Sequence, residues 1–265
     1  MTAFTIDPND VVGAVARLRA RRPRVHCITN AAAVTLTANV LLAAGAVPSM
    51  TVNPEEVPDF VAGADALLVN LGTLDPQRQA AIDAAVEVAT EAGTPWVLDP
   101  VFVERSPVRL ALARRLAAAE PTVIRLNRPE LAALTGTGGH ETAGDATAAD
   151  DASADAYALS SLSTVARTGD VDYVTEGGRA VRVAGGHPLT TLVTATGCAT
   201  GALMAGFLAV EHDAVVAAAA CLAFVSAAAE RAGAEAAGPG TFSPLFIDAL
   251  NRLSPEDIGA STRIS

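Results

Sequence analysis

The fold is decided by three short apolar runs that each end in a polar residue: Ala66-Leu-Leu-Val-Asn70, Pro95-Trp-Val-Leu-Asp99 and Thr122-Val-Ile-Arg-Leu-Asn127. Between them lie stretches with helical periodicity, at about 76–93 and 106–119. Strands that are apolar throughout and alternate with helices are typical of a parallel sheet covered on both faces. We therefore predict an α/β fold with a mostly parallel central sheet and helices on both of its faces.

The same alternation continues on either side of these runs. Upstream we predict strands at 24–29 and 46–52, helices at 9–21 and 33–44, and a short helix that Asn53 caps. Downstream we predict helices at 129–136, 153–162, 198–211, 213–232 and 242–252, and extended segments at 164–168, 172–176, 180–183 and 189–192. Gly177-Gly178 predicts a hairpin turn, so the last strands should pair antiparallel. The polar segment 136–155 reads as a mobile loop, and without a repeat or linker we expect one domain over residues 1–265.

Composition narrows the classes of partner. Lys and Arg number 18 against 29 Asp and Glu, and the net charge of −11 argues against binding nucleic acid or an anionic membrane. Cys27, Cys198 and Cys221 are scattered without a CxxC pair, which predicts free thiols and a cytoplasmic location. The N-terminus lacks the features of a signal peptide, and the Ala-rich run 214–229 is too short for a membrane span, so we expect a buried helix there.

Polar side chains follow most of the predicted strands. Because ligands bind beyond the carboxyl ends of strands in open parallel sheets, these residues should converge on one site. The residues at or just past strand ends are Asn30, Met50, Asn70 to Thr73, Asp99, Asn127 with Glu130, and Thr168 with Gly169.

Three of the charged residues suggest a nucleotide and its metal. Asp99 and Glu130 are placed to hold Mg²⁺ through water, although Glu130 could equally be an acid in the first turn of a helix. Arg125 stands in an apolar strand and needs a partner, which could be a phosphate or an internal carboxylate.

The segment Thr194-Ala-Thr-Gly-Cys-Ala-Thr-Gly201 combines a turn of small residues with the start of an apolar helix. A helix N-terminus presents unpaired N–H groups and so forms an anion site, and Gly197 and Gly201 allow close approach to the backbone. Cys198 lies where a reactive side chain would face that anion, and the helix N-terminus should lower its pKa. The alternative is an ordinary turn with a packed thiol. We predict that His26 and Cys27 are core or subunit-contact residues and that Cys221 packs.

Eight segments in this order resemble the hydroxyethylthiazole kinases, which belong to the ribokinase-like superfamily. The segments are 25–30, 37–46, 48–50, 70–74, 98–101, 125–130, 168–175 and 194–198. The resemblance implies ATP-dependent phosphorylation of the hydroxyl of 4-methyl-5-(2-hydroxyethyl)thiazole, a step toward thiamine. It also implies a homotrimer with active sites between subunits.

The resemblance assigns roles to several residues. Met50 would contact the thiazole, and Arg125 and Thr168 would contact ATP. The turn 194–198 would face the transferred phosphoryl group, with the backbone of Ala195 and Gly197 meeting the substrate. Cys198 stands where related sugar kinases have Asp, so it would assist or position the attacking hydroxyl.

The chain departs from the family pattern at two places. Ala195 replaces a glycine and is tolerable only with a negative φ, and the family's Gly-rich segment is here Phe102 to Ser106. The competing hypotheses are another ribokinase-like small-alcohol kinase, such as a hydroxymethylpyrimidine kinase, and a non-catalytic nucleotide-binding relative.

Overall fold

The computed structural model describes residues 4–137 and 146–265, and its centre is one continuous sheet. The strand order is β2-β1-β3-β4-β5-β6-β7-β8, with parallel pairing from β2 to β6 and antiparallel pairing from β6 to β8. The strands are β1 Arg24–Ile28, β2 Val47–Ser49, β3 Ala66–Asn70, β4 Trp96–Asp99, β5 Val123–Asn127, β6 Thr164–Thr168, β7 Val171–Thr175 and β8 Ala180–Ala184. The predicted mostly parallel α/β fold is confirmed.

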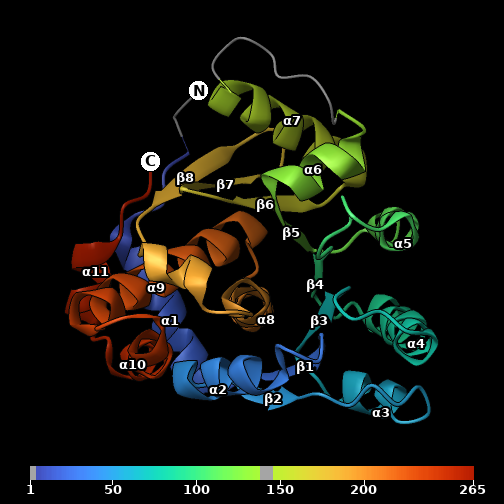
Figure 1. Cartoon of the computed structure of the whole chain (residues 1–265), viewed down its shortest axis with the longest axis horizontal. Coiled ribbons are helices and arrows are strands. Elements are labelled where there is room, and N and C mark those ends of the chain that lie inside the picture. Colours follow the sequence, from blue (N-terminus) through green and yellow to red (C-terminus); the bar gives the residue numbers. More distant parts are fainter. Residues whose placement is uncertain (1–3, 138–145) are drawn as a thin grey trace.

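Helices cover both faces of this sheet (Figure 1). One face carries α1 Pro8–Arg21, α2 Val34–Ala44, α8 Thr196–Leu208, α9 Ala214–Glu235, α10 Pro239–Arg252 and α11 Pro255–Ser261. The other carries α3 Val57–Ala62, α4 Pro76–Ala92, α5 Pro107–Ala117, α6 Arg128–Thr135 and α7 Ala146–Ser161. A 3₁₀-helix, η1 Pro188–Leu192, precedes α8.

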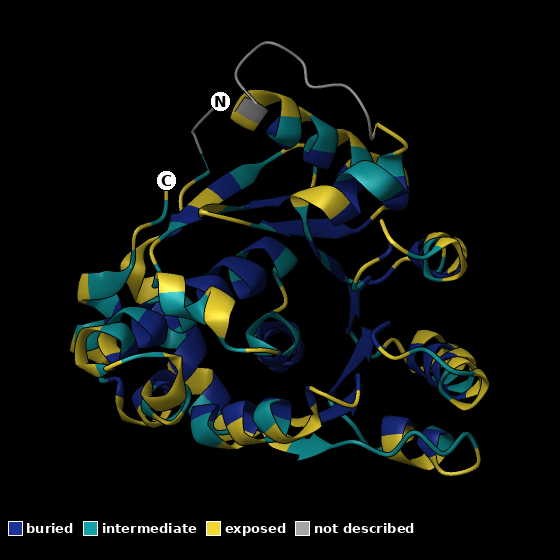
Figure 2. Cartoon of the chain, in the orientation of Figure 1, coloured by how far each residue is buried: buried dark blue, intermediate teal, exposed yellow. Residues whose placement is uncertain are grey.

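The apolar runs that predicted the fold form its core. Every residue of β3 and β4 is buried, and successive side chains contribute alternately to two apolar clusters: Leu68 and Val97 to the α8 side, Leu67 and Leu98 to the α4 side. Ten consecutive residues of α8, from Ala199 to Leu208, are also buried, and Figure 2 shows this helix enclosed beside the sheet. The chemistry predicted for the start of α8 therefore sits on a rigid element.

The predicted buried helix at 214–229 corresponds to α9. By length and composition α9 could cross a membrane, but 67% of its most apolar 18-residue window is buried inside the protein. Its Ala-rich surface, which includes Cys221, packs between α1, α8 and α10. We therefore read α9 as a core helix.

Several predicted elements differ from the structure, and the strand predicted at 46–52 spans only Val47–Ser49. Residues 189–192 form the 3₁₀-helix rather than a strand, because Pro188 begins a tight turn that His187 caps. Asn53 caps only a turn, and α3 begins at Val57. Helix α7 begins at residue 146, inside the predicted loop, and the rest of that loop from 138 to 145 lies outside the described residues. We did not predict α11, after which Ile264 bridges to β8.

Candidate active site

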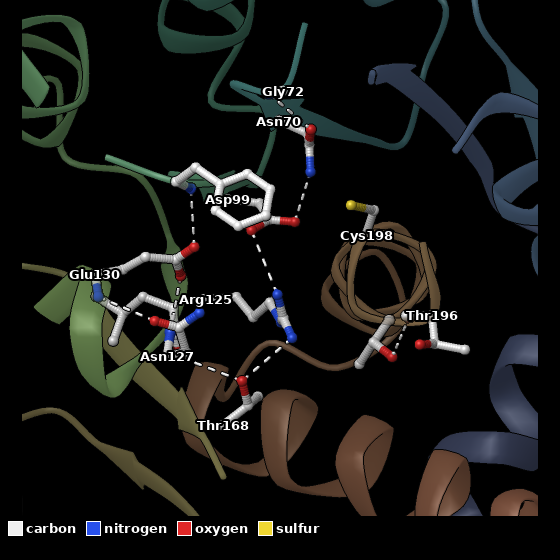
Figure 3. A network of polar contacts seen from close by, with 12 residues as sticks. Asn70, Gly72, Asp99, Arg125, Asn127, Glu130, Thr168, Thr196 and Cys198 are labelled. Carbon is white, nitrogen blue, oxygen red and sulfur yellow. Dashed lines mark hydrogen bonds and ion pairs between the residues drawn. The ribbon is translucent and has the colours of Figure 1, made fainter. Parts of the chain in front are cut away.

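The predicted strand-end residues do meet at one edge of the sheet. Asn70, Asp99, Asn127 and Thr168 are the last residues of β3, β4, β5 and β6, all at the carboxyl ends of parallel strands. The first turn of α8 faces them, and Figure 3 shows Arg125 between Asp99 and Thr168 with Cys198 close by. The site therefore combines four strand ends with one helix N-terminus.

Arg125 is the centre of this arrangement. Its Nη1 donates to Asp99 Oδ1 at 3.4 Å, and its Nη2 donates to Thr168 Oγ1 at 3.2 Å. Its buried Nε has no partner among the described residues, so the guanidinium keeps a spare donor. Burial acts to lower the pKa of Arg125, but the charges of Asp99 and Glu130 outweigh it and raise the pKa. An internal carboxylate is thus the partner of Arg125, and donor capacity remains for a phosphate.

Asp99 is completely buried and accepts a hydrogen bond from Asn70 Nδ2 at 2.7 Å. Burial raises its pKa, and the charge of Arg125 and the bond from Asn70 offset part of that rise. The carboxylate is therefore held by donors while its surroundings disfavour its charge. A cation at this place would stabilise the ionised form.

Glu130 closes a capping box at the start of α6. Its Oε2 accepts from the backbone N–H of Asn127 at 2.9 Å, and its Oε1 accepts from that of Phe102 at 3.1 Å. Burial, followed by the charge of Asp99, raises the pKa of Glu130 to about 7. Glu130 is therefore an acid in the first turn of α6, which was one of the two alternatives, and the charge of Asp99 acts on its carboxyl group.

The N-terminus of α8 differs from most helix starts in this chain. The starts of α1, α4 and α6 are capped by the side chains of Asp7, Asp75 and Asn127, whereas no side chain of the described residues caps α8. Its first N–H groups remain available for an anion. Gly197, in this first turn, lies against Arg125: a Cβ there would come 2.8 Å from Arg125 Nη2.

Two expectations about this turn were wrong. Ala195 has a φ of +70°, in the left-handed region, although we expected that alanine would require a negative φ. The pKa of Cys198 is raised, not lowered, because burial dominates and the charge of Asp99 adds to it. Hydrogen bonds from Asn70 and Asn30 and the charge of Arg125 act in the opposite direction without overcoming burial. The thiol is therefore mostly neutral at neutral pH.

A cavity of about 600 Å³ opens beside this cluster, within the range of small-molecule sites. Its lining includes the polar residues Arg125 and Thr168, the backbone of Gly197, and the apolar residues Leu222, Val225 and Phe246. Sequence reasoning missed the wall formed by Gly185, Gly186 and His187. The Gly185-Gly186 pair was the available sequence signal for this wall, because glycine readily adopts the positive φ that both residues have.

The remaining predicted residues are buried or packed against the core. Met50 follows β2, is partly buried and packs against the core on the α8 side. His26, Cys27 and Cys221 are buried, as expected for core residues. Among the described residues, no three His, Cys, Asp or Glu side chains form a metal cluster.

The chain has a ribokinase-like fold. An Enterococcus faecalis ribokinase-like superfamily protein shares the fold at a TM-score of 0.66 and 14% identity, covering 93% of this chain and 95% of that one. The chain belongs to the hydroxyethylthiazole kinase family, whose sequence model matches residues 15–256.

Individual relatives agree with this assignment. The probable hydroxyethylthiazole kinase of Agrobacterium fabrum is 43% identical over 250 residues, covering 94% of this chain and 92% of the relative. The hydroxyethylthiazole kinase of Klebsiella pneumoniae strain 342 is 48% identical over 237 residues, covering 88% and 91%. The structure of the hydroxyethylthiazole kinase protein from Pyrococcus horikoshii OT3 superposes with a TM-score of 0.92 at 35% identity, covering 97% and 98%.

Proposed function

We propose that this chain transfers a phosphoryl group from ATP to the hydroxyl of 4-methyl-5-(2-hydroxyethyl)thiazole, with Mg²⁺, giving the thiazole phosphate for thiamine biosynthesis and salvage. One observation carries the proposal: Arg125 and the uncapped N-terminus of α8 lie against each other and line the same cavity of about 600 Å³. The family supports the identity of the acceptor alcohol.

The cavity lining combines the charged and apolar side chains that ATP requires. Arg125 and Thr168 would bind the phosphates, since the guanidinium stays charged and has a spare donor at Nε. The base would lie against Val225 of α9 and Phe246 of α10.

The acidic pair fits Mg²⁺ held through water. Both oxygens of Glu130 already accept hydrogen bonds from backbone N–H groups, and Asp99 accepts them from Asn70 and Arg125. A Mg²⁺ ion that is bound through water would leave these hydrogen bonds in place. Mg²⁺ keeps several waters and uses one or two carboxylates together with substrate phosphates. When bound, Mg²⁺ would neutralise the charge of the phosphates.

The acceptor alcohol would lie between Met50 and the start of α8. Its thiazole would contact Met50, and the backbone of Ala195 and Gly197 would meet the substrate. The N–H groups at the start of α8 would receive the oxygens of the transferred group. Phosphoryl transfer passes through a loose transition state, so positioning and charge neutralisation supply most of the acceleration.

Cys198 would stand beside the attacking hydroxyl. Because burial raises the pKa of this thiol, it is a weak proton acceptor at neutral pH. Its contribution is therefore mainly to position the hydroxyl, with a modest share of proton transfer.

The assembly and location form part of the proposal. We propose a homotrimer with active sites between subunits; Leu42 and Val47 leave apolar surface exposed near β2 and Met50. The three cysteines are all free thiols, which supports a cytoplasmic location. Light scattering on the purified protein would test the trimer, and a monomeric mass would contradict it.

The decisive assay is ADP release with ATP and Mg²⁺ over a panel of hydroxyalkyl heterocycles. We expect turnover with the hydroxyethylthiazole and much less with a hydroxymethylpyrimidine. Preference for the pyrimidine would favour the other small-alcohol kinase. ATP binding without turnover of any alcohol would favour a non-catalytic nucleotide-binding protein.

A further inference from the structure

Two buried asparagines connect the Cys198 sulfur to Asp99. Asn30 Nδ2 donates to Cys198 Sγ at 3.2 Å and to Asn70 Oδ1 at 3.1 Å. Asn70 Nδ2 then donates to Asp99 Oδ2 at 2.7 Å. Asn30 and Asn70 are 8% and 1% exposed, so water competes little for these bonds.

The chemistry of the two amides fixes their orientation. Asn70 Oδ1 accepts both from Asn30 and from the backbone N–H of Gly72, at 3.1 Å and 3.0 Å. A flipped Asn70 amide would place N–H groups against two donors and an oxygen against Asp99. The two N–H bonds of Asn30 are directed to Asn70 and to the sulfur. The sulfur of Cys198 is therefore an acceptor in this chain of bonds.

The packing of Gly72 against Asn30 is independent evidence that the position of the Asn30 side chain is fixed. A Cβ at Gly72 would lie 2.5 Å from the Cβ of Asn30, a contact that real Cβ atoms do not make. The backbone of Gly72 thus packs directly on Asn30 while its N–H holds Asn70. A side chain at position 72 would displace the amide that bonds Cys198.

We propose that Asn30 and Asn70 are positioning residues that hold the Cys198 sulfur by N–H donation, so that it faces the acceptor alcohol at the start of α8. This inference rests on the proposed function and adds two residues to it. Both amides hydrogen-bond the thiol, and Asn70, which Asp99 and the Gly72 N–H hold in place, also holds the Asn30 amide. Neither amide needs to contact the phosphates.

The test uses Asn30→Leu and Asn30→Asp, which are close in size to asparagine and lack the N–H donors. Iodoacetamide reacts with thiolates, and Cys198 is the partly exposed cysteine, whereas Cys27 and Cys221 are fully buried. Its alkylation rate can be followed on the Cys198 peptide by mass spectrometry. We expect a fall of about three- to tenfold in Asn30→Leu, the range for an ordinary hydrogen bond. Asn30→Asp should react more slowly still, because its carboxylate faces the sulfur.

A merely structural role predicts the opposite sign. A loosened site exposes the thiol and speeds its alkylation, so an equal or faster rate in either folded variant would overturn the proposal. The control is Asn251→Leu, the same change at an exposed asparagine that bonds Ala43 O, and it should leave the rate unchanged. In the ADP-release assay, kcat should fall while the KM for ATP stays constant. If no alcohol is turned over, the proposed function fails, but the alkylation rates still test the positioning.

Discussion

Gly197 and Arg125 are in direct contact because Gly197 has no side chain. A Cβ on Gly197 would lie 2.8 Å from Arg125 Nη2 and 3.2 Å from Arg125 Cζ. The guanidinium occupies the space that any other residue would fill, and from there it reaches Asp99 and Thr168. The first turn of α8 and the end of β5 can therefore act on the same ligand.

Gly197→Ala should displace Arg125 and weaken ATP binding. The loss of one hydrogen bond to a charged group is about 1.5–3 kcal/mol, so we expect kcat/KM for ATP to fall about 10- to 100-fold. The control is Gly206→Ala in the same helix, where a Cβ would make ordinary van der Waals contacts, the nearest with Leu18 Cδ1 at 3.4 Å. If steady-state kinetics gave the same kcat/KM for ATP in both variants, Arg125 would not be part of the nucleotide site.

Asp99→Asn and Glu130→Gln should separate the metal role from the capping role. Asp99→Asn should raise the Mg²⁺ concentration needed for half-maximal rate more than Glu130→Gln does, because both Glu130 oxygens are bonded to backbone N–H groups. Glu130→Gln loses one of those bonds and should lower the free energy of unfolding by about 1 kcal/mol. Reaction rates measured against Mg²⁺ concentration test the metal role, and thermal unfolding tests the capping role. Identical Mg²⁺ curves for Asp99→Asn and the unmodified protein would contradict the assignment.

Cys198→Ala should lower kcat by about tenfold, below the 10²–10⁴-fold typical of a general base, because the thiol is mostly neutral. Cys198→Asp should stay active, since a carboxylate can accept the proton of the alcohol. An unchanged kcat in Cys198→Ala would reduce the thiol to a packing residue. Loss of activity in a folded Cys198→Asp would contradict the analogy with sugar kinases.

The strand ends could be predicted because their signal is local. An apolar run followed by Asn or Asp marks the end of a buried strand, and parallel pairing then brings Asn70, Asp99 and Asn127 to one edge. The pKa of Cys198 could not be predicted in this way. The helix N-terminus is visible in the sequence, but the depth of burial depends on how α8 packs against β3 and β4. The neighbouring 3₁₀-helix was missed because 189–192 is as apolar as an edge strand.

Ala195 shows a further limit of sequence reasoning. Its φ of +70° lies in the left-handed region, where alanine is strained and glycine is not. Ala195→Gly should therefore raise the free energy of unfolding by about 1 kcal/mol. Chemical denaturation would measure this, with Ala202→Gly in the middle of α8 as the contrasting change that should destabilise. A loss of stability in Ala195→Gly would show that the left-handed geometry is not strained.

His26 should make the stability of the protein depend on pH. It is fully buried, its Nδ1 lies 2.8 Å from Ser49 Oγ, and its Nε2 has no partner within residues 4–137 and 146–265. Burial lowers its pKa from 6.5 to about 4. His26 therefore binds a proton near pH 6.5 in the unfolded chain but only near pH 4 in the folded protein. His26 makes its full contribution to the free energy of unfolding above pH 6.5. As the pH falls toward 4, about 3 kcal/mol of that contribution is lost.

His26→Asn should remove this dependence while keeping a polar atom near Ser49. The informative quantity is the difference in free energy of unfolding between the unmodified protein and the variant, measured by denaturant titration from pH 7.5 to 4, because the other titrating groups cancel. That difference should shrink by about 3 kcal/mol as the pH falls. A flat difference for His26→Asn would mean that the folded protein binds the proton as readily as the unfolded chain, and that the imidazole ring is not shielded from water.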